Sequence, residues 1–169
     1  MVNSSSISIE KIKEQTQVLL MQHGYFSLNQ FPLPVEQIAK SLGYSVFSFS
    51  PKRDDKIISG AISKKRKEIL ISSEDPYERQ RFTLAHEIGH AVLHFPNDPA
   101  DSTFIDYRTP GIRTPRELEA DEFAGSLLMP EDHFKKAWVN TNNNFYQLSK
   151  IFYVSQAAIG VRAFNLNLQ

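Results

Sequence analysis

The pentapeptide His86-Glu87-Ile88-Gly89-His90 constrains the fold of this chain more than any other part of the sequence, because its two histidines need a helix to act together. Apolar residues recur at helical spacing between positions 78 and 94, at Phe82, Leu84, Ala85, Ile88, Val92 and Leu93. Residues four apart on a helix differ by about 40° around its axis and by one turn along it. The sequence therefore predicts a helix over 78–94 that turns both imidazoles toward one point.

Two imidazoles at this spacing are typical ligands of a divalent metal ion. The chain has no cysteine, so thiolate ligands, disulfides and thiol nucleophiles are excluded, and any metal must be bound by histidines and carboxylates. We expect zinc, with manganese or iron as alternatives for such ligands. Glu87 can reach a metal-bound water, whose pKa zinc lowers to about 7, without being a ligand itself. The alternative is that His86 and His90 are ordinary helix residues and Glu87 is solvated.

A third ligand is expected, because catalytic zinc usually keeps three protein ligands and one open position. His94 continues the series of histidines, but it lies a further turn along the helix. Residues 91–93 contain no glycine that could bend the chain toward the ion. We therefore predict a packing or hydrogen-bonding role for His94.

A second helix, predicted from Pro115 to about Leu128, supplies the acidic candidates. Glu117 and Asp121 are four residues apart and share a face, whereas Glu119 points about 200° away from Glu117. One carboxylate can bind the metal while the other, a turn away, accepts the free N–H of a ligand imidazole. This pairing favours Glu117 as the third ligand and Asp121 as the acceptor, with Glu119 as the alternative ligand.

The rest of the chain predicts a mostly helical α+β domain over 9–169, after a disordered tail at 1–8. Helical spacing recurs in five further segments, 9–23, 35–42, 131–140, 144–152 and 156–166. Alternating segments at 44–49, 57–63 and 68–72 predict a three-stranded antiparallel sheet packed against the histidine helix. The segment 95–115 is rich in Pro, Asp, Thr and Gly, which predicts a long loop.

The balance of charges gives no reason to expect nucleic acid or a membrane as a partner. The 169 residues carry 19 basic and 19 acidic side chains, so no net charge attracts nucleic acid or an anionic membrane. The N-terminus has no signal-peptide pattern, and no apolar run approaches the roughly 20 residues that span a bilayer. We expect a cytoplasmic protein without direct contacts to nucleic acid or membrane.

Two other classes of function remain open. Residues 144–166 have the spacing of a helix-turn-helix, although Lys150 and Arg162 are the only basic residues from Phe145 to the end of the chain. A DNA reader normally clusters several cations. The other class is a non-proteolytic regulator that binds a repressor and holds a structural metal, but such a site has no use for Glu87.

Two blocks of the sequence closely resemble the signature of the ImmA/IrrE family of metallopeptidases. They are Arg81 to His94, and Glu117 to Ala124 followed by Leu127-Leu128-Met129-Pro130. The resemblance extends over nearly the whole chain from about residue 10. Gly125 and Ala163 depart from the pattern, and neither is a proposed ligand.

The resemblance implies a gluzincin-type endopeptidase, with zinc ligands at His86, His90 and Glu117 and with Glu87 as the catalytic residue. It also implies a substrate, a DNA-binding helix-turn-helix repressor whose cleavage releases genes of a mobile element or a stress response. We expect this repressor to be a separate polypeptide. The oligomeric state does not follow from the sequence.

Overall fold

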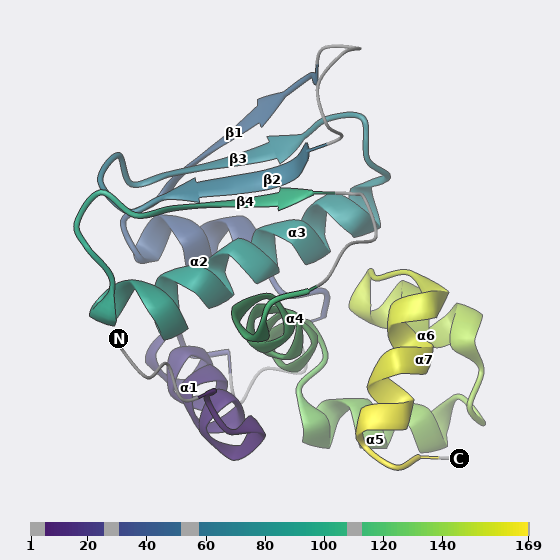
Figure 1. Cartoon of the computed structure of the whole chain (residues 1–169). Helices are drawn as coiled ribbons and strands as arrows, with labels where there is room; N and C mark the ends of the chain where they lie inside the picture. Colours follow the sequence, from purple (N-terminus) through teal and green to yellow (C-terminus); the bar gives the residue numbers. More distant parts are fainter. Residues whose placement is uncertain (1–5, 26–30, 52–57, 108–112, 169) are drawn as a thin grey trace.

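The computed structural model describes residues 6–25, 31–51, 58–107 and 113–168 (Figure 1). Its helices and strands follow one another as α1 (Ile9–Gln22), α2 (Val35–Ser41), β1 (Ser45–Phe49), β2 (Ile58–Ser63), β3 (Glu68–Ser72), α3 (Tyr77–Gly89), the π-helical turn η1 (His90–His94), the 3-10 turn η2 (Phe95–Asn97), β4 (Thr103–Tyr107), α4 (Pro115–Leu128), α5 (Glu131–Asn140), α6 (Phe145–Phe152) and α7 (Gln156–Asn165). The predicted α+β class, with helices dominating, is confirmed. In the described part of the chain, none of the helices combines the length and hydropathy needed to cross a bilayer.

The predicted sheet of three antiparallel strands is wrong in two respects. The sheet has four strands in the order β1-β3-β2-β4, and β1 runs parallel to β3. β2 and β3 form the expected hairpin, in which the buried Ile62 faces the buried Ile69. Alternation of polar and apolar residues identifies a strand but carries no information about its neighbour, so the parallel pair could not be predicted.

The fourth strand, β4, lies inside the segment 95–115 that was predicted to be a loop. It pairs antiparallel with β2 and forms one edge of the sheet. Only Phe104 and Asp106 are half-buried in it, while the alternate residues are exposed, so its inward face is too short to stand out in a polar segment. Residues 108–112 of the predicted loop lie outside the described residues.

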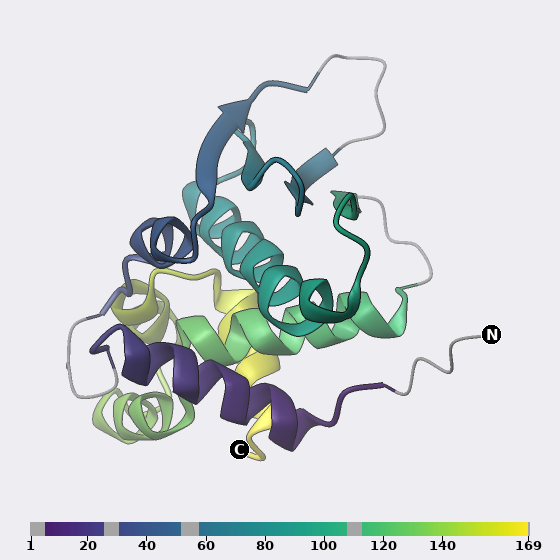
Figure 2. The same ribbon diagram turned by 90° about the vertical axis from the view of Figure 1, so that its left-hand side faces the viewer.

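Helix α3 lies between the sheet and α4 (Figures 1 and 2). Its residues Leu84, Ala85 and Ile88 are buried, and α4 contributes the fully buried Phe123, Ala124 and Leu127 to the same core. Gly89 allows the two helices to approach closely. A Cβ at this position would lie 3.2 Å from the Ala120 Cα atom and from two atoms of Phe123.

We expect Gly89→Ala to destabilise the protein by about 1–3 kcal/mol, because the added methyl group meets backbone and a ring rather than a movable side-chain end. Gly125→Ala is the matched control, because that glycine lies within α4 and a Cβ there meets no atom within 4 Å. The control should instead raise stability by up to about 1 kcal/mol, the helix preference of alanine over glycine. Thermal unfolding of both variants measures this, and destabilisation of equal size in the two would contradict the close-approach explanation.

Ile7 and Ser8, which lie directly ahead of α1, both make hydrogen bonds to helices. Ser8 caps α1 by accepting a hydrogen bond from the Lys11 backbone N–H. The Ile7 backbone N–H donates to Glu119 Oε1 of α4 over 2.7 Å. Residues 1–5 of the predicted tail lie outside the described residues.

The region predicted to resemble a helix-turn-helix consists of α6 and α7, joined by a turn in which Tyr153 adopts a left-handed conformation. Ser155 caps α7 by accepting a hydrogen bond from the Ala158 backbone N–H. Arg162 of α7 is buried and donates to the Met129 carbonyl and to the Glu122 carboxylate. These bonds attach the C-terminal helices to the end of α4.

Candidate metal centre

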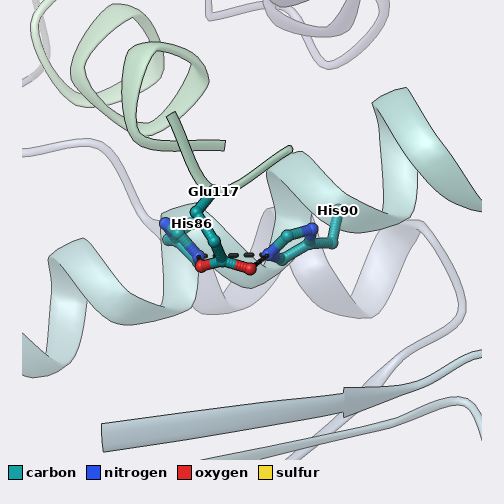
Figure 3. A group of neighbouring side chains, drawn as sticks. All are labelled: His86, His90 and Glu117. Carbon is teal, nitrogen blue, oxygen red and sulfur yellow. Dashed lines mark hydrogen bonds and ion pairs between the residues drawn. The ribbon is translucent and has the colours of Figure 1, made fainter. Parts of the chain in front are cut away.

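Three side chains from two helices meet at one point, and they are His86, His90 and Glu117 (Figure 3). One ligand atom from each lies within 4.8 Å of the others. The two Nε2 atoms are 3.1 Å apart, and the Glu117 carboxylate oxygens lie 3.2 Å from His86 Nε2 and 3.4 Å from His90 Nε2. Figure 3 shows the carboxylate facing both rings.

These separations fit a divalent cation. Two ligand atoms at about 2.0–2.1 Å from a tetrahedral ion lie about 3.3 Å from each other, which matches the spacing of the three atoms. His86 and His90 are buried and Glu117 is partly buried, so most of the group is shielded from solvent. The π-helical turn begins at His90, where α3 ends, and leaves both histidines with the α-helical spacing that their approach requires.

Asp121 contacts the outer nitrogen of His86. Its Oδ1 lies 3.0 Å from His86 Nδ1, and its Oδ2 pairs with the Arg113 guanidinium. A carboxylate at this position favours a proton on Nδ1 and leaves the Nε2 lone pair directed at the three-residue group. Asp121 thus lies where an acceptor for the free nitrogen of a ligand imidazole was predicted.

His94 and Glu119, the alternatives considered for the third ligand, lie outside the group and contact each other. His94 Nε2 is 3.0 Å from Glu119 Oε2, and His94 Nδ1 is 2.9 Å from His90 Nδ1. His94 therefore makes hydrogen bonds, as predicted. The contact between His94 and Glu119 was not predicted, because it joins two segments, η1 and α4, that are separate in the sequence.

Glu87, the neighbour of His86 in the chain, is fully buried. Neither carboxylate oxygen has a hydrogen-bond partner among the described residues. Gly60 of β2 makes room for this carboxylate, since a Cβ there would lie 2.9 Å from Glu87 Oε1 and 2.5 Å from Thr83 Cγ2. Burial, opposed by His86 and reinforced by Asp106, raises the pKa of Glu87 to about 8. A buried carboxyl with unused oxygens is costly unless a cation or water engages it.

The charges of the three grouped residues are strongly coupled. Burial opposes ionisation of Glu117, but hydrogen bonds to His86 and His90 hold its pKa well below the ordinary value. Burial lowers the pKa of His90 to about 4. Burial would also lower that of His86, yet the bond to Glu117 and the nearby carboxylates of Glu87 and Asp106 raise it overall. The imidazole of His90 is thus kept neutral, and the acidic groups around His86 favour a positive charge between the three grouped residues.

A groove of about 1350 Å³ leads to the group. His86, Glu117 and Asp121 line one end, and the remaining walls come from the start of α3, from residues 105–107 of β4 and from α6 and α7. Asp106 of β4 lies in this wall and was missed in the sequence, although the alternating residues 103–107 could have indicated it. Burial raises the pKa of Asp106. The groove is large enough to admit a segment of polypeptide.

Comparison with solved structures shows the fold again in a protein of very different sequence. A Mycobacterium tuberculosis transcriptional regulator superposes with a TM-score of 0.62 at 14% identity, over 88% of this chain and 45% of that one. At this identity the similarity concerns the fold alone.

Two similar sequences come from different settings, and one of them carries a name that refers to a metalloprotease. The chain is 40% identical over 72 residues to the radiation response metalloprotease IrrE of Deinococcus radiodurans, covering 43% of this chain and 22% of the relative. It is 37% identical over 68 residues to the uncharacterized immunity region protein 2 of Bacillus phage phi105, covering 40% of this chain and 41% of that one. The chain thus spans less than half the length of these relatives.

The family comparison covers most of the chain, including every residue of the metal group. Residues 39–164 match the model of Peptidase_M78, described as the IrrE N-terminal-like domain. With its helix-borne histidines, its facing carboxylate and this match, the chain belongs to the IrrE N-terminal-like family of metallopeptidases.

Proposed function

We propose that the protein is a zinc-dependent endopeptidase that cleaves a DNA-binding repressor of the helix-turn-helix type. His86, His90 and Glu117 are the proposed ligands, Asp121 orients His86, and Glu87 is the catalytic residue. The observation that carries the proposal is the convergence of three ligand atoms, within 4.8 Å, beside a groove that His86 and Glu117 help to line.

The bound metal would supply Lewis acidity, which activates a water molecule and polarises the scissile carbonyl. The chain's own residues do the remaining work. Asp121 and Arg113 hold His86 in the tautomer whose Nε2 lone pair faces the group. Glu87 accepts the proton of the attacking water on its unpaired carboxylate and returns it to the departing amine. A pKa raised toward neutrality suits a group that must both take and release this proton.

A repressor substrate is proposed from the nature of the relatives. One is named for a radiation response and another for an immunity region, and both names are compatible with control of a stress response or of a mobile element. The groove, with walls from β4, α3, α6 and α7, suits an extended or locally unfolded segment of another polypeptide. A cytoplasmic location remains a prediction that accords with such a substrate.

Direct DNA binding by α6 and α7 is less favoured. Of the two basic residues from Phe145 onward, Arg162 is buried in bonds to Glu122 and to the Met129 carbonyl. Lys150 alone is left to contact phosphates, whereas DNA readers use several cations.

Incubation with the helix-turn-helix repressor encoded nearest to the gene tests the proposal. We expect wild-type protein with zinc or manganese to produce two repressor fragments from a single cut, identified by mass spectrometry, and chelator to prevent this. A repressor that is bound but never cut, with either metal, would instead support a non-proteolytic regulator. A helix-turn-helix protein from an unrelated operon is the control and should stay intact.

A further inference from the structure

Four groups form a continuous hydrogen-bonded series that leads from the metal group to the N-terminal segment. His90 Nδ1 lies 2.9 Å from His94 Nδ1, and His94 Nε2 lies 3.0 Å from Glu119 Oε2. The other oxygen of Glu119 accepts the Ile7 backbone N–H over 2.7 Å. His90, His94 and Glu119 are all buried, so solvent does not compete for these bonds.

The carboxylate of Glu119 determines which nitrogens of His94 and His90 carry protons. An ionised carboxylate only accepts hydrogen bonds, so His94 Nε2 must carry the proton that it shares with Glu119. A neutral His94 then presents a lone pair at Nδ1, and His90 Nδ1 must donate to it. With its proton on Nδ1, His90 directs the lone pair of Nε2 toward Glu117 and His86, which a metal ligand requires.

The ring of His90 is contacted on its face by Phe104 and at its edge by His94. Phe104 of β4 stacks on it with ring centroids 4.1 Å apart and an angle of 9° between the planes. The stacked phenyl ring offers no acceptor to Nδ1, so the bond to His94 is the contact that favours a proton on this nitrogen of His90. The other histidine of the group, His86, has a carboxylate, Asp121, directly on its Nδ1.

We propose that His94 and Glu119 are positioning residues for His90, and that the Ile7 backbone N–H fixes Glu119, so that a backbone group just ahead of α1 supports the metal site. The inference rests on the proposed ligand role of His90. Glu119 acts on His90 through one intervening imidazole, in the way that Asp121 acts directly on His86. The competing explanation is a purely structural tie between η1, α4 and the N-terminal segment.

Metal affinity and the spectrum of a bound probe ion separate these explanations. We expect His94→Phe, which keeps an aromatic ring but removes both nitrogens, to weaken Zn²⁺ binding about 10–100-fold in competition with a chromophoric chelator. The visible absorption bands of bound Co²⁺ should shift, because His90 can then rotate or change tautomer. Glu119→Gln should change both readouts in the same direction. His94→Asn, whose side-chain oxygen can accept from His90 Nδ1, should restore most of the affinity.

The backbone bond has its own pair of variants. Ile7→Pro removes the N–H that Glu119 accepts, whereas Ile7→Ala removes the side chain and keeps the N–H. We expect Zn²⁺ affinity to fall several-fold in the proline variant and to stay at the wild-type level in the alanine variant. Equal affinities in both variants would remove the N-terminal segment from the proposal.

Failure of this inference and failure of the proposed function are distinguishable. If wild-type protein binds Zn²⁺ tightly while His94→Phe shows the same affinity and the same Co²⁺ spectrum, the positioning role is wrong and the peptidase proposal stands. A purely structural role predicts this result together with a lower melting temperature of the metal-free variant. If wild-type protein binds neither ion, the metal centre itself is wrong, and the inference is overturned with it.

Discussion

Glu87→Gln is expected to abolish peptide hydrolysis while leaving the metal in place. The amide cannot accept the proton of the attacking water, and loss of a positioned general base commonly costs about 10²–10⁴-fold in rate. Glu87 is not one of the three grouped ligand residues, so Zn²⁺ affinity should change little. Equilibrium dialysis with Zn²⁺ and the rate of repressor cleavage measure the two properties separately.

The matched control is Glu10→Gln, which makes the same chemical change at an exposed position in the first turn of α1, away from the groove. It should cleave at the wild-type rate. Cleavage by Glu87→Gln within tenfold of the wild-type rate would remove Glu87 from the mechanism. Loss of both cleavage and zinc would show instead that the carboxylate supports metal binding.

The local part of the site could be predicted because helix geometry determines it. The spacing of His86 and His90 sets their mutual direction on any helix, and the four-residue separation of Glu117 and Asp121 places both on one face of the next. The structure brings the first three of these residues together and sets Asp121 against His86. We predicted that the two helices meet at the metal site because catalytic zinc needs a third ligand. No pattern in the residues between the helices indicated it.

The parts that could not be predicted depend on contacts between distant segments. Glu119 faces away from Glu117, as expected, but nothing in the sequence indicates that His94 occupies that side. The space that Gly60 leaves for Glu87 arises only where β2 crosses α3. β4 was hidden because its inward face is limited to Phe104 and Asp106, within a segment whose composition is typical of loops.

In metal-free protein, the buried carboxyl of Glu87 is expected to make stability depend on pH. Its pKa is raised from the ordinary 4.5 to about 8, so the folded state keeps a proton that the unfolded state releases. A group with a raised pKa contributes stability below pH 4.5 and loses it as pH rises through about 8. Between pH 5 and 8 this loss amounts to about 3 kcal/mol, or about 6–12 °C in melting temperature for a domain of this size.

Glu87→Gln isolates this effect, because the variant lacks the titrating group and keeps every other one. The wild-type and variant proteins, both stripped of metal, should have similar melting temperatures near pH 5, where the wild-type carboxyl is neutral. At pH 8 the variant should melt higher by several degrees. Zn²⁺ should raise the melting temperatures of both proteins by similar amounts, since the three ligand residues are present in each. Parallel melting curves across this pH range would mean that water or another group already stabilises the charge, and that Glu87 is ionised before the metal arrives.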